Sequence, residues 1–342
     1  MSLKNNLKTV SIVIPCYNEK EYIIRCLDSI AKQSYPKEYI TVFICDGNST
    51  DGTLDLLKAY VLKNHSFILL INTEKTTPHA LNLGIKNSTS DVVIILGAHS
   101  EIDKDFVKQG MEAFSVDPSI MCVGGLLENV YENETSKTIG LAMSSVFGVG
   151  NAHFRTGTKK GYVDTVAFGA YKKEIFEKVG LFNEELIRNQ DDEFNYRVTS
   201  SGFKIYLTPE VKCKYFVRAS FLKLFKQYYQ YGYWKMYVNV LHKTVTTVRQ
   251  LVPAAFVIYL FVLLLLAAIN PFLFLIATSV FALYLTIAII FAFGQDSNPV
   301  TAVKIVYAFI ILHFSYGVGY IQGIMDFLVF GRKIKKAESL SR

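Results

Sequence analysis

Cysteine is scarce in this chain of 342 residues, and its few copies follow no recognisable pattern. The five cysteines are odd in number and scattered, and no two of them form a Cys-x-x-Cys pair. A disulfide framework and a cysteine-based metal cluster are therefore not expected, whereas reduced thiols suit a cytosolic domain. The N-terminal segment also lacks the apolar core of a cleaved signal peptide, so we expect the N-terminal domain to stay in the cytoplasm.

Acidic residues are missing from residues 211–249, a segment that holds eight Lys or Arg and ten aromatic residues. The net charge of the chain is +7, so without these eight cations it would be close to neutral. Basic residues interleaved with aromatics are typical of interfacial helices on an anionic membrane surface. Such a mixture can also bind single-stranded nucleic acid. The apolar region that follows argues against a nucleic-acid partner and favours the membrane.

Charge is absent from the 46 positions 250–295. Asn270-Pro271 divides them into stretches of 20 and 24 residues, each long enough to cross roughly 30 Å of hydrocarbon. A third uncharged stretch, at 305–325, contains polar residues and glycines. Three crossings would place the basic C-terminal tail outside, whereas two crossings and a re-entrant segment would keep both basic regions inside. The expected transmembrane region is 250–330, with helices at about 250–269, 271–293 and 303–325.

Strands and helices alternate in the first hundred residues, which predicts an α/β domain with an open, mostly parallel sheet. We place this domain at residues 1–210. Ligands of such sheets bind at the carboxyl ends of the strands. Strands are expected at 10–14, 39–45, 67–72 and 92–96, and helices at 18–33 and 53–62.

Polar and aromatic side chains follow the first two of these strands. Pro15, Tyr17, Asn18 and Glu19 come at the end of the first strand, and Asp46 ends the second. An aromatic ring at this edge can stack on a nucleotide base, and a carboxylate can accept an N–H of a pyrimidine. Alternatively, both segments are ordinary strand-to-helix turns.

Together, and about thirty residues apart, these two motifs resemble the start of the family 2 glycosyltransferases with the GT-A fold. The resemblance continues in order to about residue 240 and is closest to the succinoglycan-type branch, whose members extend lipid-linked exopolysaccharide repeats. It implies a Rossmann-like GT-A catalytic domain followed by transmembrane helices, and a nucleotide-diphosphate sugar as donor. The further matching segments are 77–84, 163–171, 180–197 and 227–235.

The resemblance also implies an inverting reaction, in which a carboxylate removes the proton of the acceptor hydroxyl. Asp191 stands at the family's base position, Asp192 is the fallback, and Gln190 stands where the family often has Glu. The residues implied in donor binding are Pro15, Tyr17, Asn18, Glu19, Asp46, Lys75 and Ala98. Those implied in acceptor binding are Asp164, Gln230 and Trp234.

The expected metal site departs from the family pattern. The branch tends to show Asp-Ala-His after the fourth strand, and this chain has Gly97, Ala98 and His99. His99 could still bind Mn²⁺ or Mg²⁺, with imidazole the better ligand for Mn²⁺. Glu101 and Asp103 could assist. The missing carboxylate makes the donor-phosphate site the least complete part of the resemblance.

The acceptor side of the resemblance is also partial. The family's Gln-x-x-Arg-Trp element retains Gln230 and Trp234 but has Tyr233 in place of Arg. This change, together with the short membrane region, favours the addition of one sugar over the synthesis of a polymer. A nearby loop could meet phosphates of a lipid diphosphate acceptor or could be a plain surface loop. Its basic residues are His153, Arg155, Lys159 and Lys160.

The resulting hypothesis is a multi-pass protein of the plasma (inner) membrane that carries a cytoplasmic catalytic domain. It would transfer a sugar, from a UDP-sugar by preference, to a lipid-linked or saccharide acceptor in polysaccharide or glycan biosynthesis. Three alternatives remain: a polyprenyl-phosphate glycosyltransferase, a processive synthase, and a non-catalytic nucleotide-sugar-binding subunit. Gly97 favours the last of these, and the Asp191 segment argues against it.

Overall fold

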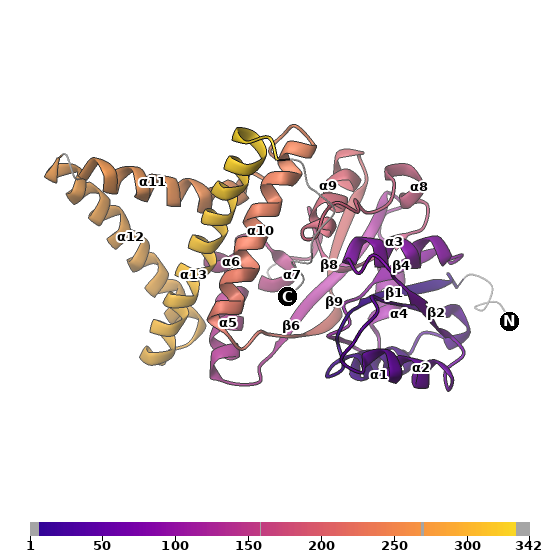
Figure 1. The fold of residues 1–342 in the computed structure, drawn as a ribbon. Coiled ribbons are helices and arrows are strands. Elements are labelled where there is room, and N and C mark those ends of the chain that lie inside the picture. The colour runs from indigo at the N-terminus through magenta and orange to yellow at the C-terminus, as the bar shows by residue number, and fades with distance from the viewer. Residues whose placement is uncertain (1–6, 158, 268–269, 333–342) are drawn as a thin grey trace. The chain divides into compact units, whose positions relative to one another are not determined.

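The chain forms two compact units, each described here by itself (Figure 1). The computed structural model describes residues 7–157, 159–267 and 270–332. Within these ranges, the first unit comprises residues up to Asn129 together with His153–Phe216. The second unit comprises Val130–Ala152 and the residues from Val217 onward. The basic and apolar C-terminal third of the chain therefore shares its unit with a segment from the middle of the chain.

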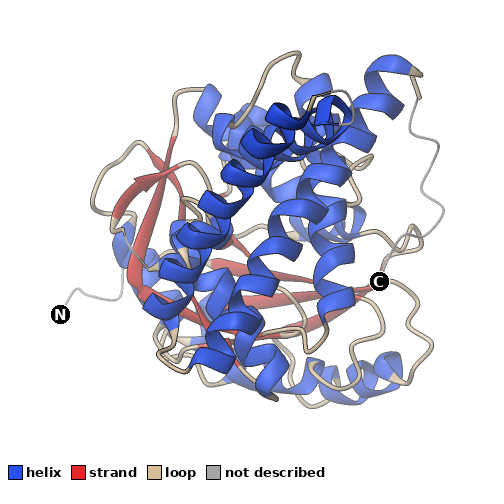
Figure 2. Ribbon diagram, turned by 90° about the vertical axis from the view of Figure 1, so that its left-hand side faces the viewer, coloured by secondary structure: helices blue, strands red, loops and turns tan. Residues whose placement is uncertain are grey.

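Parallel pairing organises the first four strands of the first unit, which are drawn in red with the rest of the sheet in Figure 2. Five of the seven residues in the first strand are apolar, and only one residue is not fully buried, as expected of a central parallel strand. The strands are β1 (Val10–Cys16), β2 (Ile40–Asp46), β3 (Phe67–Ile71) and β4 (Val92–Ile95), and the helices between them are α1 (Ile23–Ala31), η2 (Lys37–Tyr39), α2 (Thr53–Val61) and α3 (Thr77–Asn87).

Antiparallel pairing extends the sheet beyond β4, in the order β3-β2-β1-β4-β8-β6-β9-β5, with β7 paired to β9. The segment 163–171, one of those that match the family pattern, contributes to two strands, β7 and β8, separated by Asp164 to Val166. Phe168 has a left-handed backbone with φ of 50°. The elements are β5 (Ser100–Ile102), α4 (Phe106–Ala113), β6 (Ile120–Val130), α7 (His153–Thr156), β7 (Gly161–Val163), β8 (Ala167–Lys172), α8 (Ile175–Val179), α9 (Gln190–Ser200) and β9 (Lys204–Phe216).

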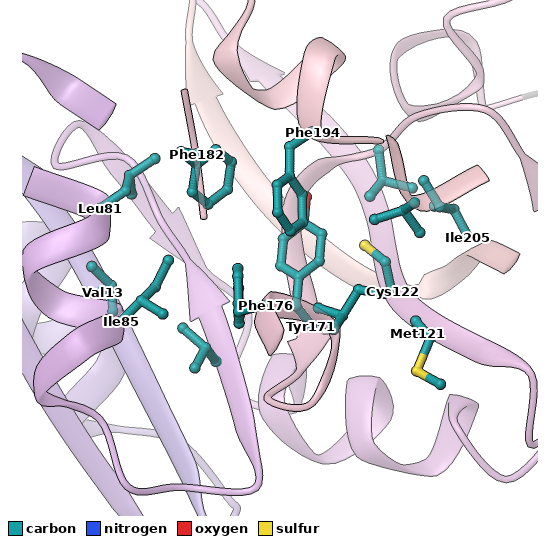
Figure 3. Packing of buried hydrophobic residues seen from close by; sticks show 14 of the residues in the cluster. Val13, Leu81, Ile85, Met121, Cys122, Tyr171, Phe176, Phe182, Phe194 and Ile205 are labelled. Atoms are coloured by element: carbon teal, nitrogen blue, oxygen red, sulfur yellow. The ribbon is translucent and has the colours of Figure 1, made fainter. Parts of the chain in front are cut away.

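The core of the first unit lies where α3, α8 and α9 meet the sheet (Figure 3). Phe194 of α9 is fully buried, and its ring stacks on Phe182 at 4.5 Å and on Phe176 at 5.3 Å between centroids. Tyr171 meets Phe194 edge to face at 5.3 Å. Removing such a ring costs about 3–5 kcal/mol. This packing fixes α9, which carries the predicted base.

The second unit is helical and contains three helices long and apolar enough to cross a membrane. These are α11 (Val252–Ala267), α12 (Pro271–Gln295) and α13 (Pro299–Gly323), the last continued by the π-helix η4 (Ile324–Val329). They correspond to the helices expected at 250–269, 271–293 and 303–325; residues 268–269 lie outside the described residues. The other elements are α5 (Glu134–Ser144), α6 (Val146–Val149), α10 (Phe221–Leu241) and η3 (Val248–Leu251).

Phe147 of α6 connects the middle segment of the chain to the apolar helices within this unit. Its ring lies 5.0 Å from Phe309 and 5.4 Å from Phe291, centre to centre. His313 Nε2 donates to its carbonyl oxygen over 2.8 Å. Residues 130–152 are thus an integral part of the helical unit.

The basic aromatic segment forms one helix, α10, which packs against α13. A Cβ added at Gly232 would collide with the carbonyl oxygen of Tyr316, and one added at Gly319 would collide with that of Tyr229. Such close backbone approach requires glycine on both helices and is typical of helix pairs in membranes. The domain limit placed at residue 210 falls inside β9, and the helix begins at Phe221. Residues 211–216 are therefore strand, not interfacial helix.

Candidate active site

The turns after β1 and β2 are joined by hydrogen bonds at the carboxyl edge of the parallel strands. Asn18 has φ of 55° and donates its N–H to Ser49 Oγ over 2.9 Å. Its Oδ1 accepts the N–H of Thr50 over 2.8 Å. Glu19 donates its N–H to Thr53 Oγ1 over 2.9 Å. Left-handed asparagine and these reciprocal bonds give the edge a fixed shape before any ligand binds.

Asp46 ends β2 and is fully buried. Its Oδ1 accepts the Ser49 hydroxyl over 2.6 Å, and its Oδ2 accepts the Ser49 N–H over 2.9 Å. A carboxylate offers about four lone-pair sites, so two bonds leave acceptor capacity. The turn therefore orients the carboxylate that is predicted to accept an N–H of the base.

Tyr17 and Lys75 approach each other across Gly47. A Cβ at Gly47 would lie 3.2 Å from Tyr17 Cδ2 and 3.4 Å from Lys75 Cα. Lys75 is exposed with φ of 60°, and Tyr17 and Pro15 are half-buried. The predicted base-stacking ring and this lysine thus belong to one surface, formed by the ends of β1, β2 and β3.

The metal candidate His99 lies beside Glu19. Its Nδ1 is 3.4 Å from Glu19 Oε1; the glutamate side chain is 4% exposed and the imidazole is 35% exposed. At Gly97, where the pattern has Asp, a Cβ would lie 3.2 Å from Phe168 Cε1. Ala98 is buried. Within residues 7–157, 159–267 and 270–332, no group of three His, Cys, Asp or Glu is placed to hold a metal ion.

His99 and Glu19 therefore form a two-residue donor set, one nitrogen and one carboxylate. Two protein ligands suffice for an ion that takes its remaining ligands from substrate phosphates and water. Glu101, named as a possible helper, lies 3.3 Å from Lys214 Nζ through its Oε2. Asp103 Oδ1 accepts the N–H of Asp105 over 3.0 Å. The fit to a divalent ion thus rests on His99 and Glu19.

The predicted catalytic residues occupy the first turn of α9. Asn189 precedes the helix with φ of 62°, Asp191 is exposed and Asp192 is partly exposed. The helix N-terminus stabilises negative charge in this turn. Burial is the main cause that raises the pKa of Tyr171 well above its usual range, and the charges of Cys122 and Asp191 add to the shift. The negative charge of Asp191 thus disfavours ionisation of the buried Tyr171 hydroxyl.

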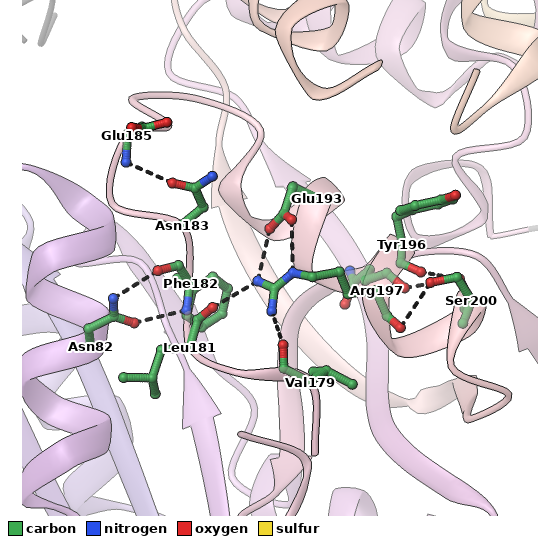
Figure 4. Close-up of polar contacts among 12 residues, drawn as sticks. Asn82, Val179, Leu181, Phe182, Asn183, Glu185, Glu193, Tyr196, Arg197 and Ser200 are labelled. Atoms are coloured by element: carbon green, nitrogen blue, oxygen red, sulfur yellow. Dashed lines mark hydrogen bonds and ion pairs between the residues drawn. The ribbon is translucent and has the colours of Figure 1, made fainter. Parts of the chain in front are cut away.

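The next carboxylate, Glu193, is buried in an ion pair with Arg197 (Figure 4). It is 2% exposed, and its oxygens accept from Arg197 Nε over 2.8 Å and Nη2 over 2.9 Å. The same guanidinium donates to the carbonyls of Val179 and Leu181. This ion pair ties α9 to the chain that precedes it.

Asn82 of α3 holds the segment between α8 and α9 from the other side (Figure 4). Its Nδ2 donates to the Phe182 carbonyl over 2.9 Å, and its Oδ1 accepts the Phe182 N–H over 3.0 Å. Glu184 receives a second bond from Asn82 and lies 3.3 Å from His79 Nε2. His79 Nδ1 lies 2.6 Å from the hydroxyl of Thr76, the residue after Lys75. Contacts thus lead from the predicted donor turn to the segment before Asp191.

The acceptor candidates are divided between the two units. Asp164 is exposed between β7 and β8 in the first unit. Gln230 and Trp234 lie on α10 in the second unit. Gln230 is half-buried, whereas Trp234 is 4% exposed and packs on Tyr233 and Tyr237. Within its unit, Trp234 is thus part of a packed aromatic group.

Several residues of this site were not expected from the sequence. Ser49 and Thr53 hold the two turns together, and Arg197 neutralises Glu193. The i,i+4 spacing of Glu193 and Arg197 was a visible signal for that pair. Tyr215 reaches His99 only because β5 pairs with β9, and no local pattern indicates that pairing.

Known proteins share both the sequence pattern and the fold. A family model described as Glycosyl transferase family 2 matches residues 11–180. A Methanococcus voltae protein is 36% identical over 232 residues, 65% of this chain and 71% of its own length; it is called dolichyl N-acetyl-alpha-D-glucosaminyl phosphate 3-beta-D-2,3-diacetamido-2,3-dideoxy-beta-D-glucuronosyltransferase. Succinoglycan biosynthesis protein ExoA of Rhizobium meliloti is 27% identical over 322 residues, 92% of this chain and 95% of that protein.

Among solved structures, the mannosyltransferase PcManGT from Pyrobaculum calidifontis, in complex with GDP-Man and Mn²⁺, superposes with a TM-score of 0.64. The match covers 94% of this chain and 88% of that one, at 16% identity. At this identity the likeness concerns the fold alone. It agrees with the α/β architecture that the strand order describes.

Proposed function

Because the chain belongs to the family 2 glycosyltransferases, we propose that it transfers one sugar from a nucleotide-diphosphate donor to a lipid-linked saccharide, with inversion at the anomeric carbon. Two relatives support this acceptor class. The name of one describes a dolichyl-linked N-acetylglucosaminyl phosphate acceptor, and the other, similar over nearly its whole length, takes part in succinoglycan biosynthesis. We take a UDP-sugar as the first donor to test.

The observation that carries the proposal is the first turn of α9. Of its three carboxylates, Glu193 is buried against Arg197, whereas Asp191 is exposed. Asp191 accepts the proton of the acceptor hydroxyl while that oxygen bonds to the anomeric carbon. The bond from that carbon to the donor diphosphate breaks on the opposite face, and the nucleoside diphosphate leaves with the electron pair. Asp192 is the alternative base in the same turn.

Donor binding is assigned to the edge formed by β1, β2, β3 and β4. Tyr17 stacks on the base, Asp46 accepts an N–H from it, and Asn18 and Lys75 complete the surface; Pro15 and Ala98 shape its backbone. His99 and Glu19 are the proposed ligands of Mn²⁺ or Mg²⁺, and a bound ion would neutralise charge on the leaving diphosphate. Nitrogen with oxygen donors suits Mn²⁺ better than Mg²⁺.

The acceptor is proposed to reach the first unit from the membrane. Three helices with membrane-spanning length and composition support a membrane protein. That it is a multi-pass protein of the plasma membrane with a cytoplasmic first unit is part of the proposal. Within the first unit, Asp164 is the proposed acceptor contact; Gln230 and Trp234 on α10 remain predictions from the family resemblance. The burial of Trp234 favours a role through the packing of α10.

The test compares Asp191→Asn with Asp192→Asn in purified full-length protein. The first change should lower transfer by about 10²–10⁴-fold, the usual contribution of a general base, and leave nucleotide binding by calorimetry nearly unchanged. Full turnover in Asp191→Asn would exclude it as the base. Donors are screened as UDP-, GDP- and dTDP-sugars, and the anomeric configuration of the product is read by NMR. A product on polyprenyl phosphate alone, or a chain of added sugars, would instead favour a polyprenyl-phosphate transferase or a processive synthase.

A further inference from the structure

A cationic side chain stacks on an aromatic ring next to the His99–Glu19 pair. Arg155, from α7, places its guanidinium carbon 4.8 Å from the centre of the Tyr215 ring. The Tyr215 ring in turn meets the His99 imidazole edge to face, with centroids 6.3 Å apart. The guanidinium is therefore one aromatic ring away from the proposed metal ligand.

The sheet fixes this arrangement. Tyr215 lies on β9 directly opposite Ser100 of β5, and Ser100 is the residue after His99. Tyr215 is 8% exposed, so its ring is held by packing, whereas Arg155 is half-buried. A guanidinium over a tyrosine face gains about 0.5–2 kcal/mol and loses side-chain freedom. Arg155 is thus oriented before a ligand arrives, which lowers the entropic cost of binding.

The charge balance at this place favours an anion. Gly97 supplies no carboxylate where the family pattern has one, and the ring of Phe168 lies against that position. The contacts around the Tyr215 ring bring together Arg155 and His99, and His99 lies beside Glu19. The neighbouring Glu101 faces Lys214 at 3.3 Å, so that pair adds little net charge. A divalent ion bound by Glu19 keeps only part of its positive charge, which is less than the negative charge of a diphosphate. A guanidinium supplies further positive charge, and its planar shape matches phosphate oxygens in bidentate geometry.

We propose that Arg155, stacked on Tyr215, binds the diphosphate of the donor and supplies positive charge there, at a site where Gly97 leaves a divalent ion one carboxylate ligand short. The inference rests on the proposed function, because it requires a nucleotide-diphosphate donor beside His99. The same chemistry could come from a phosphate of the lipid-linked acceptor. Because Arg155 is linked through Tyr215 to His99, which follows β4 at the edge where the donor is assigned, we assign the phosphate to the donor.

The experiment measures binding of UDP, GDP and dTDP to the purified full-length protein by calorimetry, in Mn²⁺ and in EDTA. Variants are Arg155→Gln, Arg155→Lys and, as control, Lys204→Gln. The control removes a cation of β9, the strand of Tyr215, whose Nζ is held by Asp117 at 2.7 Å. A bond to a charged group contributes about 1.5–3 kcal/mol, so Arg155→Gln should weaken binding by about 10–150-fold in both media. Arg155→Lys should recover part of the loss, and Lys204→Gln should bind as the wild type.

Four results decide the matter, with thermal unfolding confirming that each variant is folded. Nucleotide binding that is unchanged in Arg155→Gln overturns the inference. Unchanged nucleotide binding combined with a raised KM for the lipid-linked acceptor also overturns it, and assigns Arg155 to the acceptor phosphate. Wild-type protein that binds none of the three nucleotides defeats the proposed function itself. An Arg155→Gln loss that persists in EDTA supports the inference.

Discussion

Replacing Arg197 with alanine tests how α9 is held in place. The change leaves the carboxylate of Glu193, which is 2% exposed, without its guanidinium and removes the donors to two carbonyls. Breaking a buried pair from one side costs about 3–5 kcal/mol. For a unit of this size each kcal/mol shifts the thermal midpoint by about 2–4 °C, so Arg197→Ala should lower it by roughly 6–20 °C. The assay is thermal unfolding of the detergent-purified protein, monitored by light scattering and by the transferase activity that remains after heating.

Two controls make this prediction specific. Lys178→Ala breaks another i,i+4 ion pair of the same unit, with Glu174, but those side chains are 40% and 49% exposed. That loss should be below about 1 kcal/mol. The double change Glu193→Leu with Arg197→Met removes both charges and should recover the part of the loss that comes from the unpaired carboxylate, though not the two bonds to the carbonyls of Val179 and Leu181. A midpoint for Arg197→Ala equal to that of Lys178→Ala, or a double variant as unstable as the single one, would refute the reasoning.

Two further outcomes follow from the surroundings of single side chains. Gly97→Asp should not strengthen Mn²⁺-dependent UDP binding measured by calorimetry, because its Cβ would lie 3.2 Å from Phe168 and 3.3 Å from the Ser100 hydroxyl. Stronger UDP binding should require the added change Phe168→Ala, and stronger binding without that change would contradict this packing. Burial raises the pKa of the Cys26 and Cys45 thiols to about 12. Their thiolate fraction at pH 8 is therefore small, and a disulfide reagent should label them slowly in native protein and rapidly after denaturation; rapid native labelling would show that they are not buried.

The parallel part of the fold was predictable because its signals are local. Each of β1, β2, β3 and β4 is a short apolar run ended by turn residues, and the three helices between them have apolar faces. The antiparallel part was not, since pairings such as Ser100 with Tyr215 join residues far apart in the sequence. That residues 130–152 belong to the helical unit could not be predicted for the same reason. Their helices pack on α13, and no periodicity reports the identity of a distant partner.

The positions of several candidate site residues were predictable from the family resemblance and from polar residues at strand ends, whereas their roles remain predictions. Asn18, Asp46 and Lys75 do lie at neighbouring strand ends, and Asp191 does begin a helix. Their supports were not foreseen, because a hydroxyl such as Ser49 gains its function only when two turns meet. The environment of His99 likewise depends on Tyr215, which meets it through the pairing of β9 with β5, and Arg155 stacks on that tyrosine.

The contact of Phe147 with His313, Phe291 and Phe309 limits how the protein can be cut. A stop codon after Phe216 would remove the three apolar helices but leave α5 and α6 attached to the first unit, with the apolar surface that α13 covers exposed to water. Such a fragment would carry a ready site for aggregation. A water-soluble catalytic unit therefore requires two excisions, and the second must replace residues 130–152 with a linker from Asn129 to His153.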